Sequence, residues 1–179
     1  MNICKFFISL FFVIELIVVC MAEDWPRFRG VNGQGISSQA VPTQWSEDKN
    51  IKWRCKLPGP GSSSPVIYRN KIFITSFSGV TTGDQDPSKL VRHIVCVDKE
   101  KGTIIWKDTV KATQPEDPYS GFLVEHGYAS NTPLIDSGRL FVYLGKSGIH
   151  CYSLDGKKLW QKSLGTGSTR RKWGSAASP

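Results

Sequence analysis

The sequence lacks the short motifs that mark common catalytic and metal sites. It contains no H-E-x-x-H, no G-x-S-x-G and no paired C-x-x-C, which argues against a zinc protease, a nucleophile-elbow hydrolase and a zinc ribbon. The glycine-rich stretch G-V-N-G-Q-G at residues 30–35 has no strand pattern before it and no helix pattern after it. We interpret it as a turn rather than a nucleotide-binding loop, so these motifs alone fix no reaction.

Cysteines are also few, with five in the whole chain and three beyond residue 22. Three thiols, Cys55, Cys96 and Cys151, do not make a disulfide scaffold. Cys96 and Cys151 occupy equivalent positions of a repeated segment, where a small apolar side chain is needed. We interpret both as buried, inert thiols.

There is one long apolar run, at the N-terminus. Residues 6–20 are apolar apart from Ser9 and Glu15, and this length falls short of the roughly 20 residues that span a bilayer. With Lys5 ahead of the run and a small-residue cleavage site after it, residues 1–22 are predicted to be a cleaved secretion signal. A retained lipid or membrane anchor is the alternative, because Glu15 interrupts the run.

Acidic residues are outnumbered, with 15 Asp and Glu against 23 Lys and Arg and a net charge of +8. Such an excess can indicate nucleic-acid binding. Here the cations fall on expected turns and outer strands, where they keep sheet edges soluble, and residues 170–172 are interpreted as a solvated loop. We therefore expect no nucleic-acid partner.

What the sequence does contain is a repeat. Residues 96–106, C-V-D-K-E-K-G-T-I-I-W, return as residues 151–160, C-Y-S-L-D-G-K-K-L-W, with one residue fewer in the turn. Each copy has a strand ending at Cys, a charged turn with one glycine and a second strand carrying Trp, which predicts a β-hairpin. The glycines and tryptophans keep one register: Gly102 with Gly156, and Trp106 with Trp160.

The repeated unit extends ahead of this hairpin. Residues 63–75 and 131–143 each contain two short β-branched or aromatic segments around a turn, with a Pro near the start. The unit is therefore four strands in meander order. We divide the chain into a leader (residues 23–49), the outer strand of an incomplete blade (50–57), two whole blades (62–110 and 129–164) and the start of another blade (172–179).

Units of roughly 45 to 55 residues with four strands and one outer-strand Trp fit a β-propeller, in which each unit is a blade. We predict an all-β fold, a partial β-propeller of four-stranded antiparallel blades. A closed ring needs about four to eight blades. The chain is therefore expected to be an N-terminal fragment, stabilised in the whole protein by the remaining blades.

The hairpin resembles the tryptophan-docking motif A-x-D-x-x-T-G-K-x-x-W of the PQQ-binding-like repeat family, the quinoprotein-type propellers. Cys96, Asp98, Gly102 and Trp106 stand at the Ala, Asp, Gly and Trp positions, whereas Lys101 and Thr103 depart from the usual Thr and Lys. In the second copy Ser153 replaces the Asp. The leader W-P-R-F-R-G-V-N-G-Q-G is also similar to that of secreted members.

The resemblance implies a structural role for the motif residues. In the family the Trp packs against the neighbouring blade, so Trp53, Trp106 and Trp160 are expected to be mostly buried there. Gly102, Gly156 and Asp98 are expected to belong to the same docking contacts.

Two functional classes follow from the resemblance. The first is a secreted, non-enzymatic propeller that binds a protein or a cell-envelope component and needs no cofactor. The alternative is a PQQ-dependent dehydrogenase, in which a full-length relative would hold the quinone with calcium and an Asp or Glu base. The adjacent cysteines of some quinoprotein dehydrogenases are missing here, and we assign no catalytic residue.

Two insertions could carry a binding site, at residues 77–90 and 112–128. In the first, Asp84 and Asp86 are spaced like the start of a calcium loop, but the later ligands are missing, so we expect a solvated turn and no metal.

The second insertion offers pocket candidates. A carboxylate beside an imidazole and aromatic rings is a workable polar site, which makes Glu125, His126 and Tyr128 candidates, together with Tyr119 and Phe122. A packed loop is the alternative. His93 and His150 lie in expected strands and are interpreted as structural.

Overall fold

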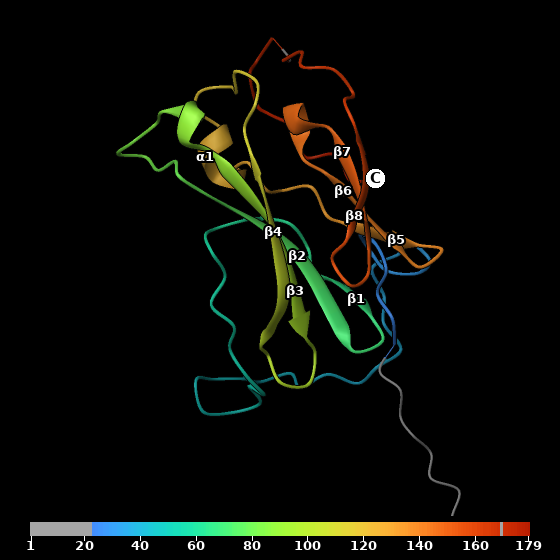
Figure 1. Cartoon of the computed structure of the whole chain (residues 1–179). Helices are drawn as coiled ribbons and strands as arrows, with labels where there is room; N and C mark the ends of the chain where they lie inside the picture. The colour runs from blue at the N-terminus through green and yellow to red at the C-terminus, as the bar shows by residue number, and fades with distance from the viewer. Residues whose placement is uncertain (1–22, 169) are drawn as a thin grey trace, which may run out of the picture.

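A computed structural model describes residues 23–168 and 170–179 (Figure 1). The predicted secretion signal, residues 1–22, lies outside the described residues. Within them the helical elements are short, and none is long and apolar enough to cross a membrane. These elements are η1 (Pro87–Lys89), α1 (Leu123–His126) and η2 (Gly145–Ser147).

Two antiparallel four-stranded sheets make up the fold, each in meander order. The first contains β1 (Val66–Tyr68), β2 (Lys71–Ser78), β3 (Val91–Asp98) and β4 (Ile104–Lys111). The second contains β5 (Leu134–Asp136), β6 (Arg139–Tyr143), β7 (Ile149–Ser153) and β8 (Lys158–Lys162). The predicted all-β, propeller-like architecture is confirmed.

The two sheets repeat each other in detail. Cys96 pairs with Trp106 across β3 and β4, and Cys151 pairs with Trp160 across β7 and β8. A register shift follows each cysteine directly, so both sheets carry a bulge at the same place. A bulge increases the local twist of a strand, which gives the two outer hairpins the same shape.

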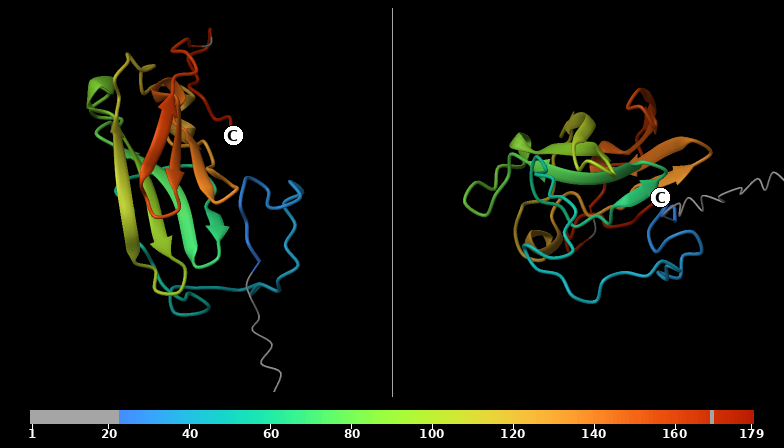
Figure 2. Two further views of the ribbon diagram at one scale, coloured as in Figure 1. Left: turned by 45° about the vertical axis from the view of Figure 1, so that its right-hand side comes forward. Right: turned by 90° about the horizontal axis from the view of Figure 1, so that it is seen from below.

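The main core lies between the sheets, which stand side by side (Figure 2). Because successive side chains of a strand point to opposite faces, one face of the first sheet supplies half of this core. Its residues have almost no exposure: Val66, Phe73, Ile94 and Cys96. The second sheet supplies most of the other half, from Ile135, Leu140, Val142 and Tyr152, and Leu144 adds to it directly after β6.

The leader joins the inner strands of both sheets. Trp25 exchanges two backbone hydrogen bonds with Ile67 of β1, at 2.8 and 2.9 Å. The next residue, Pro26, accepts a bond of 2.7 Å from the backbone N–H of Ile135 in β5. The leader therefore links the inner edges of the two sheets.

Residues 50–57, predicted to be an outer strand, form no strand in the described structure. A strand needs a backbone partner, and none of the described strands pairs with this segment. Residues 172–179 likewise form no strand. Trp53 of the first segment bonds to Lys99 in the turn between β3 and β4, and the second segment bonds to Asn131 and Thr132 just before β5.

Candidate functional site

The contact that joins the two sheets at their outer edge is an indole over a glycine turn. Trp106 of β4 donates its Nε1–H to the carbonyl of Leu154 at 3.1 Å, and its ring covers Gly156 in the turn between β7 and β8. Gly156 has φ of +89°, and a Cβ there would lie 2.7 Å from the indole. Only glycine fits this position without strain.

The same contact occurs once more, on the other side of the first sheet. Trp53 donates to the carbonyl of Lys99 at 2.8 Å and covers Gly102, which has φ of +68°. A Cβ on Gly102 would lie 2.4 Å from that ring. Trp53 makes this contact although its segment is not a strand.

Asp98 builds the first turn rather than touching the ring. Its carboxylate accepts hydrogen bonds from the backbone N–H groups of Lys101 and Glu100, at 2.8 and 2.9 Å, and from the Asn70 amide at 3.1 Å. The bond from Lys101 is the main reason why the pKa of Asp98 is lowered. In the second turn the hydroxyl of Ser153 accepts from Lys157 at 3.2 Å and takes over this role.

Trp160 differs from its repeat equivalent. It was predicted to be mostly buried against a neighbouring blade, but it is 40% exposed and packs on Phe141 of its own sheet, with ring centroids 5.9 Å apart. Among the described residues no glycine turn lies over its ring.

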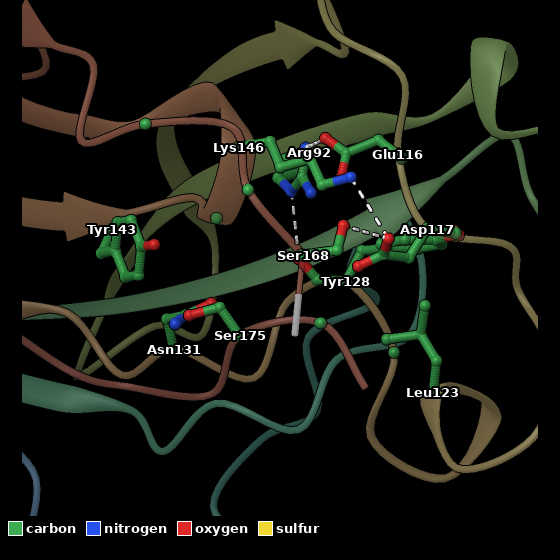
Figure 3. Close-up of a pocket in the computed structure, with 15 residues that line it drawn as sticks. Arg92, Glu116, Asp117, Leu123, Tyr128, Asn131, Tyr143, Lys146, Ser168 and Ser175 are labelled. Carbon is green, nitrogen blue, oxygen red and sulfur yellow. Dashed lines mark hydrogen bonds and ion pairs between the residues drawn. The ribbon is translucent and has the colours of Figure 1, made fainter. Parts of the chain in front are cut away.

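A polar cavity of about 240 Å³ lies at the end of the sheets where the long loops meet (Figure 3). Its walls come mainly from β3, the insertion 112–128, η2 and the chain that follows β8, and Tyr143 of β6 and Asn131 complete the lining. Its charged lining residues are Arg92, Glu116, Asp117 and Lys146.

Arg92 ties the insertion to the first sheet. It points from β3 and forms a buried ion pair with Glu116, with Nη1 2.8 Å from Oε1 and both side chains no more than 5% exposed. The same Nη1 donates to the hydroxyl of Ser147 at 3.2 Å, and Nε donates to the carbonyl of Tyr128 at 3.1 Å. A buried guanidinium with this many acceptors positions the loop rigidly.

Asp117 ties the same insertion to the second sheet. One carboxylate oxygen accepts from Lys146 Nζ at 3.2 Å and from the Ser168 hydroxyl at 2.5 Å (Figure 3). Its carbonyl accepts from the Tyr128 hydroxyl at 2.5 Å. Burial, and then the nearby charge of Glu116, raise the pKa of Tyr128, so this phenol remains a donor.

A comparison with protein-family models places the repeat in a known family. Residues 88–178, just over half of the chain, match the model described as outer membrane protein assembly factor BamB, a PQQ-like repeat family. The chain belongs to this family. A search of curated proteins found no significant match.

The match begins in η1 and runs through both docking turns and the cavity loops of this BamB-family chain. It therefore includes Trp106 with its glycine turn and both buried ion pairs. The resemblance inferred from the repeated hairpin is confirmed.

The structure does not bring the three predicted pocket residues together. Tyr128 lines the polar cavity, whereas His126 lines a separate hollow beside Arg27 and Ser62. Glu125 is exposed on α1 and lines neither. The three side chains therefore do not form one acid–base site.

The two aromatic candidates, Tyr119 and Phe122, also lie in different surroundings. Tyr119 is buried and stacks on Tyr128 at 5.5 Å, in a cluster with Phe77. Phe122 points outward and is 55% exposed. The insertion is thus a packed loop on one side and an exposed surface on the other.

The charged residues of the cavity were missed by the sequence analysis. The signal was an arginine near the start of the largely apolar strand V-R-H-I-V-C-V, together with the adjacent pair Glu116 and Asp117 in the insertion. A buried cation needs a carboxylate, and this insertion is the nearest acidic stretch that follows the sheet. Its fold-back over Arg92 could not be derived from spacing.

The first insertion is held by its own charges. Asp84 pairs with Lys89 at 2.5 Å, and the carboxylate of Asp86 accepts from the Ser88 N–H at the start of η1. These bonds lower the pKa of both acids. Within residues 23–168 and 170–179, no group of three or more candidate ligands could hold a metal ion.

The two strand histidines are buried with one hydrogen bond each. His93 Nε2 lies 2.8 Å from the hydroxyl of Ser78, and His150 Nε2 donates to the carbonyl of Ser147 at 3.0 Å. Their Nδ1 atoms have no partner among the described residues. Burial is the main reason why the pKa of each is lowered.

Proposed function

We propose that this protein is a secreted β-propeller repeat protein that acts as a binding and scaffold module in the cell envelope. The observation that carries this proposal is the double ion-paired anchoring of the insertion 112–128. Arg92 holds it to one sheet and Lys146 holds it to the other. A loop fixed in this way is a rigid platform, and loops on a rigid scaffold are where proteins commonly place binding residues.

The family supports a protein partner. Its description names an assembly factor of the outer membrane, and such a role requires contact with other proteins. We extend this to the present chain: the loops at the cavity end of the sheets contact a protein of the cell envelope. The chain reaches that compartment through the predicted signal at residues 1–22.

A quinone enzyme is the competing function, and the ion pairs of the cavity favour the scaffold over it. PQQ is a planar tricarboxylate, so a site for it needs cations that are free to bind carboxylates. Arg92 and Lys146 are already paired with Glu116 and Asp117. Entry of the quinone would leave these buried carboxylates unpaired, which costs several kcal/mol.

Two measurements test the proposal. The first is fractionation of cells that express the whole chain with a C-terminal tag, followed by N-terminal sequencing. We expect the protein in the envelope or periplasmic fraction with Glu23 at its start. Cytoplasmic protein that retains Met1 would contradict secretion.

The second is calorimetric titration with PQQ and Ca²⁺, followed by a dye-linked dehydrogenase assay. We expect neither saturable heat at micromolar quinone nor turnover of alcohols. Saturable binding that is lost in Lys146→Met, but kept in the surface control Lys157→Met, would support the quinone enzyme and overturn the scaffold proposal.

A further inference from the structure

Two large aromatic side chains lie exposed beside each other at the cavity end of the molecule. Phe122, at the start of α1, is 55% exposed, and Trp173, in the chain after β8, is 43% exposed. Their ring centroids are 5.0 Å apart, with the planes tilted by 41°. The pair joins the insertion after β4 to the chain after β8.

The backbone beneath this pair is fixed by contacts that do not use the two rings. His126 donates from Nε2 to the carbonyl of Trp173 at 2.8 Å and accepts at Nδ1 from the Ser130 hydroxyl at 2.9 Å. Leu123 is buried against Gly174. About half of each residue's surface therefore remains exposed although the chain that carries the rings is anchored.

Three consecutive cations adjoin the aromatic pair. Arg171 places its guanidinium 4.7 Å from the centroid of the Trp173 ring, and Arg170 and Lys172 are exposed on either side of it. None of the three forms an ion pair among the described residues, unlike Arg92 and Lys146. Glu125 on α1 is exposed nearby, so the cations outnumber the acids here.

We propose that Phe122, Trp173 and residues 170–172 form a docking surface for an acidic segment of a protein partner. An aromatic or long aliphatic side chain of that segment packs against the aromatic pair, and its carboxylates meet the three cations. Trp and Arg dominate the energetics of protein interfaces, and charge complementarity raises both the association rate and the selectivity. This inference rests on the proposed binding function and assigns it a surface.

The observations favour an acidic peptide over a nucleic acid. Nucleic-acid affinity comes from many phosphate contacts along a track of cations, whereas these cations are confined to three consecutive residues. The two aromatic rings are tilted against each other and form one small cluster, not a row of rings on which successive bases could stack. A short segment with one apolar anchor matches that extent.

The test is a binding titration of the whole protein by fluorescence anisotropy. The probe is a short fluorescein-labelled peptide of Asp and Glu around a central Leu or Phe. One control peptide has Lys in place of the acids, and a second has Gly in place of the anchor. We expect only the first peptide to bind saturably, with an affinity that falls as salt rises.

Variants locate the binding. Trp173→Ala and Phe122→Ala should each weaken binding by about tenfold or more, as for interface anchors, and Arg171→Gln should weaken it and flatten its salt dependence. The matched control is Trp45→Ala, which removes a 69% exposed indole from the leader. It should bind as the wild type does.

Three results would overturn the docking surface. The first is binding of the acidic peptide that Trp173→Ala and Phe122→Ala leave unchanged, with folding verified by thermal melting. The second is no binding of the acidic peptide, and the third is tighter binding of a single-stranded DNA oligonucleotide in the same assay. If envelope proteins still cross-link to the chain elsewhere, the proposed function survives without this surface. If no part of the chain cross-links to a partner, both proposals fail.

Discussion

Removing the indole of Trp106 tests the docking of one sheet on the other. In Trp106→Ala the ring over Gly156 is lost, together with its hydrogen bond to Leu154 and its contact with Tyr152, whose ring centroid lies 6.2 Å away. The substitution also leaves a gap beside Phe73 in the inter-sheet core. No backbone bond of β4 is changed.

The expected cost follows from these contacts. A fully buried Phe or Trp cut to Ala costs about 3 to 5 kcal/mol, and Trp106 is half-buried, so we take about 2 kcal/mol for packing. The lost hydrogen bond adds about 1 kcal/mol. A total of about 3 kcal/mol corresponds to a lower midpoint by roughly 6 to 12 °C in a chain of this size.

The chain supplies its own control. Trp160 is the repeat equivalent of Trp106 but is 40% exposed and covers no glycine turn in the described structure, so Trp160→Ala should cost about 1 kcal/mol or less. Both variants are compared with the wild type by urea denaturation and thermal melting. Equal losses for the two variants, or a loss for Trp160→Ala alone, would refute the docking argument.

Three further substitutions probe other contacts. Gly156→Ala should lower the thermal midpoint more than Gly138→Ala, because both have positive φ but only the first meets a ring; similar midpoints would contradict the close approach. Arg92→Met should cost about 3 to 5 kcal/mol in urea denaturation because it strands a buried carboxylate, and adding Glu116→Leu should restore part of this; no recovery would argue against the pair. Burial lowers the pKa of His150, so the unfolded chain binds the proton first and stability falls as pH drops below about 6.5. His150→Gln should flatten that fall in thermal midpoints measured down to about pH 5, and an unchanged pH profile would count against it.

The fold could be predicted because the sequence contains the same four-stranded unit twice. The shared spacing of Gly102 and Trp106 with Gly156 and Trp160 fixes the outer hairpins, and alternation fixes their faces. The state of residues 50–57 and of Trp160 could not be predicted in the same way. A strand or a docked ring needs a partner, and sequence similarity between repeats does not say whether the described chain supplies one.

The site was less predictable than the fold. Glu125, His126 and Tyr128 are close in sequence, but the short helix α1 and the turn after it send their side chains in different directions. Arg92 and Glu116 are far apart in sequence and meet because the insertion folds back over β3. Such contacts depend on the path of a loop, which no local pattern encodes.

The most direct test of the binding function is photo-crosslinking in living cells. A photoreactive phenylalanine analogue replaces Phe122 in one variant and Lys157, an exposed turn residue remote from the cavity loops, in another. We predict a discrete adduct from position 122 and no such adduct from position 157. Mass spectrometry of the adduct should identify an envelope protein that is cross-linked through an acidic segment. No adduct at position 122, or the same set of adducts at both positions, would contradict the docking surface, and no adduct from any position of the chain would contradict the binding function as well.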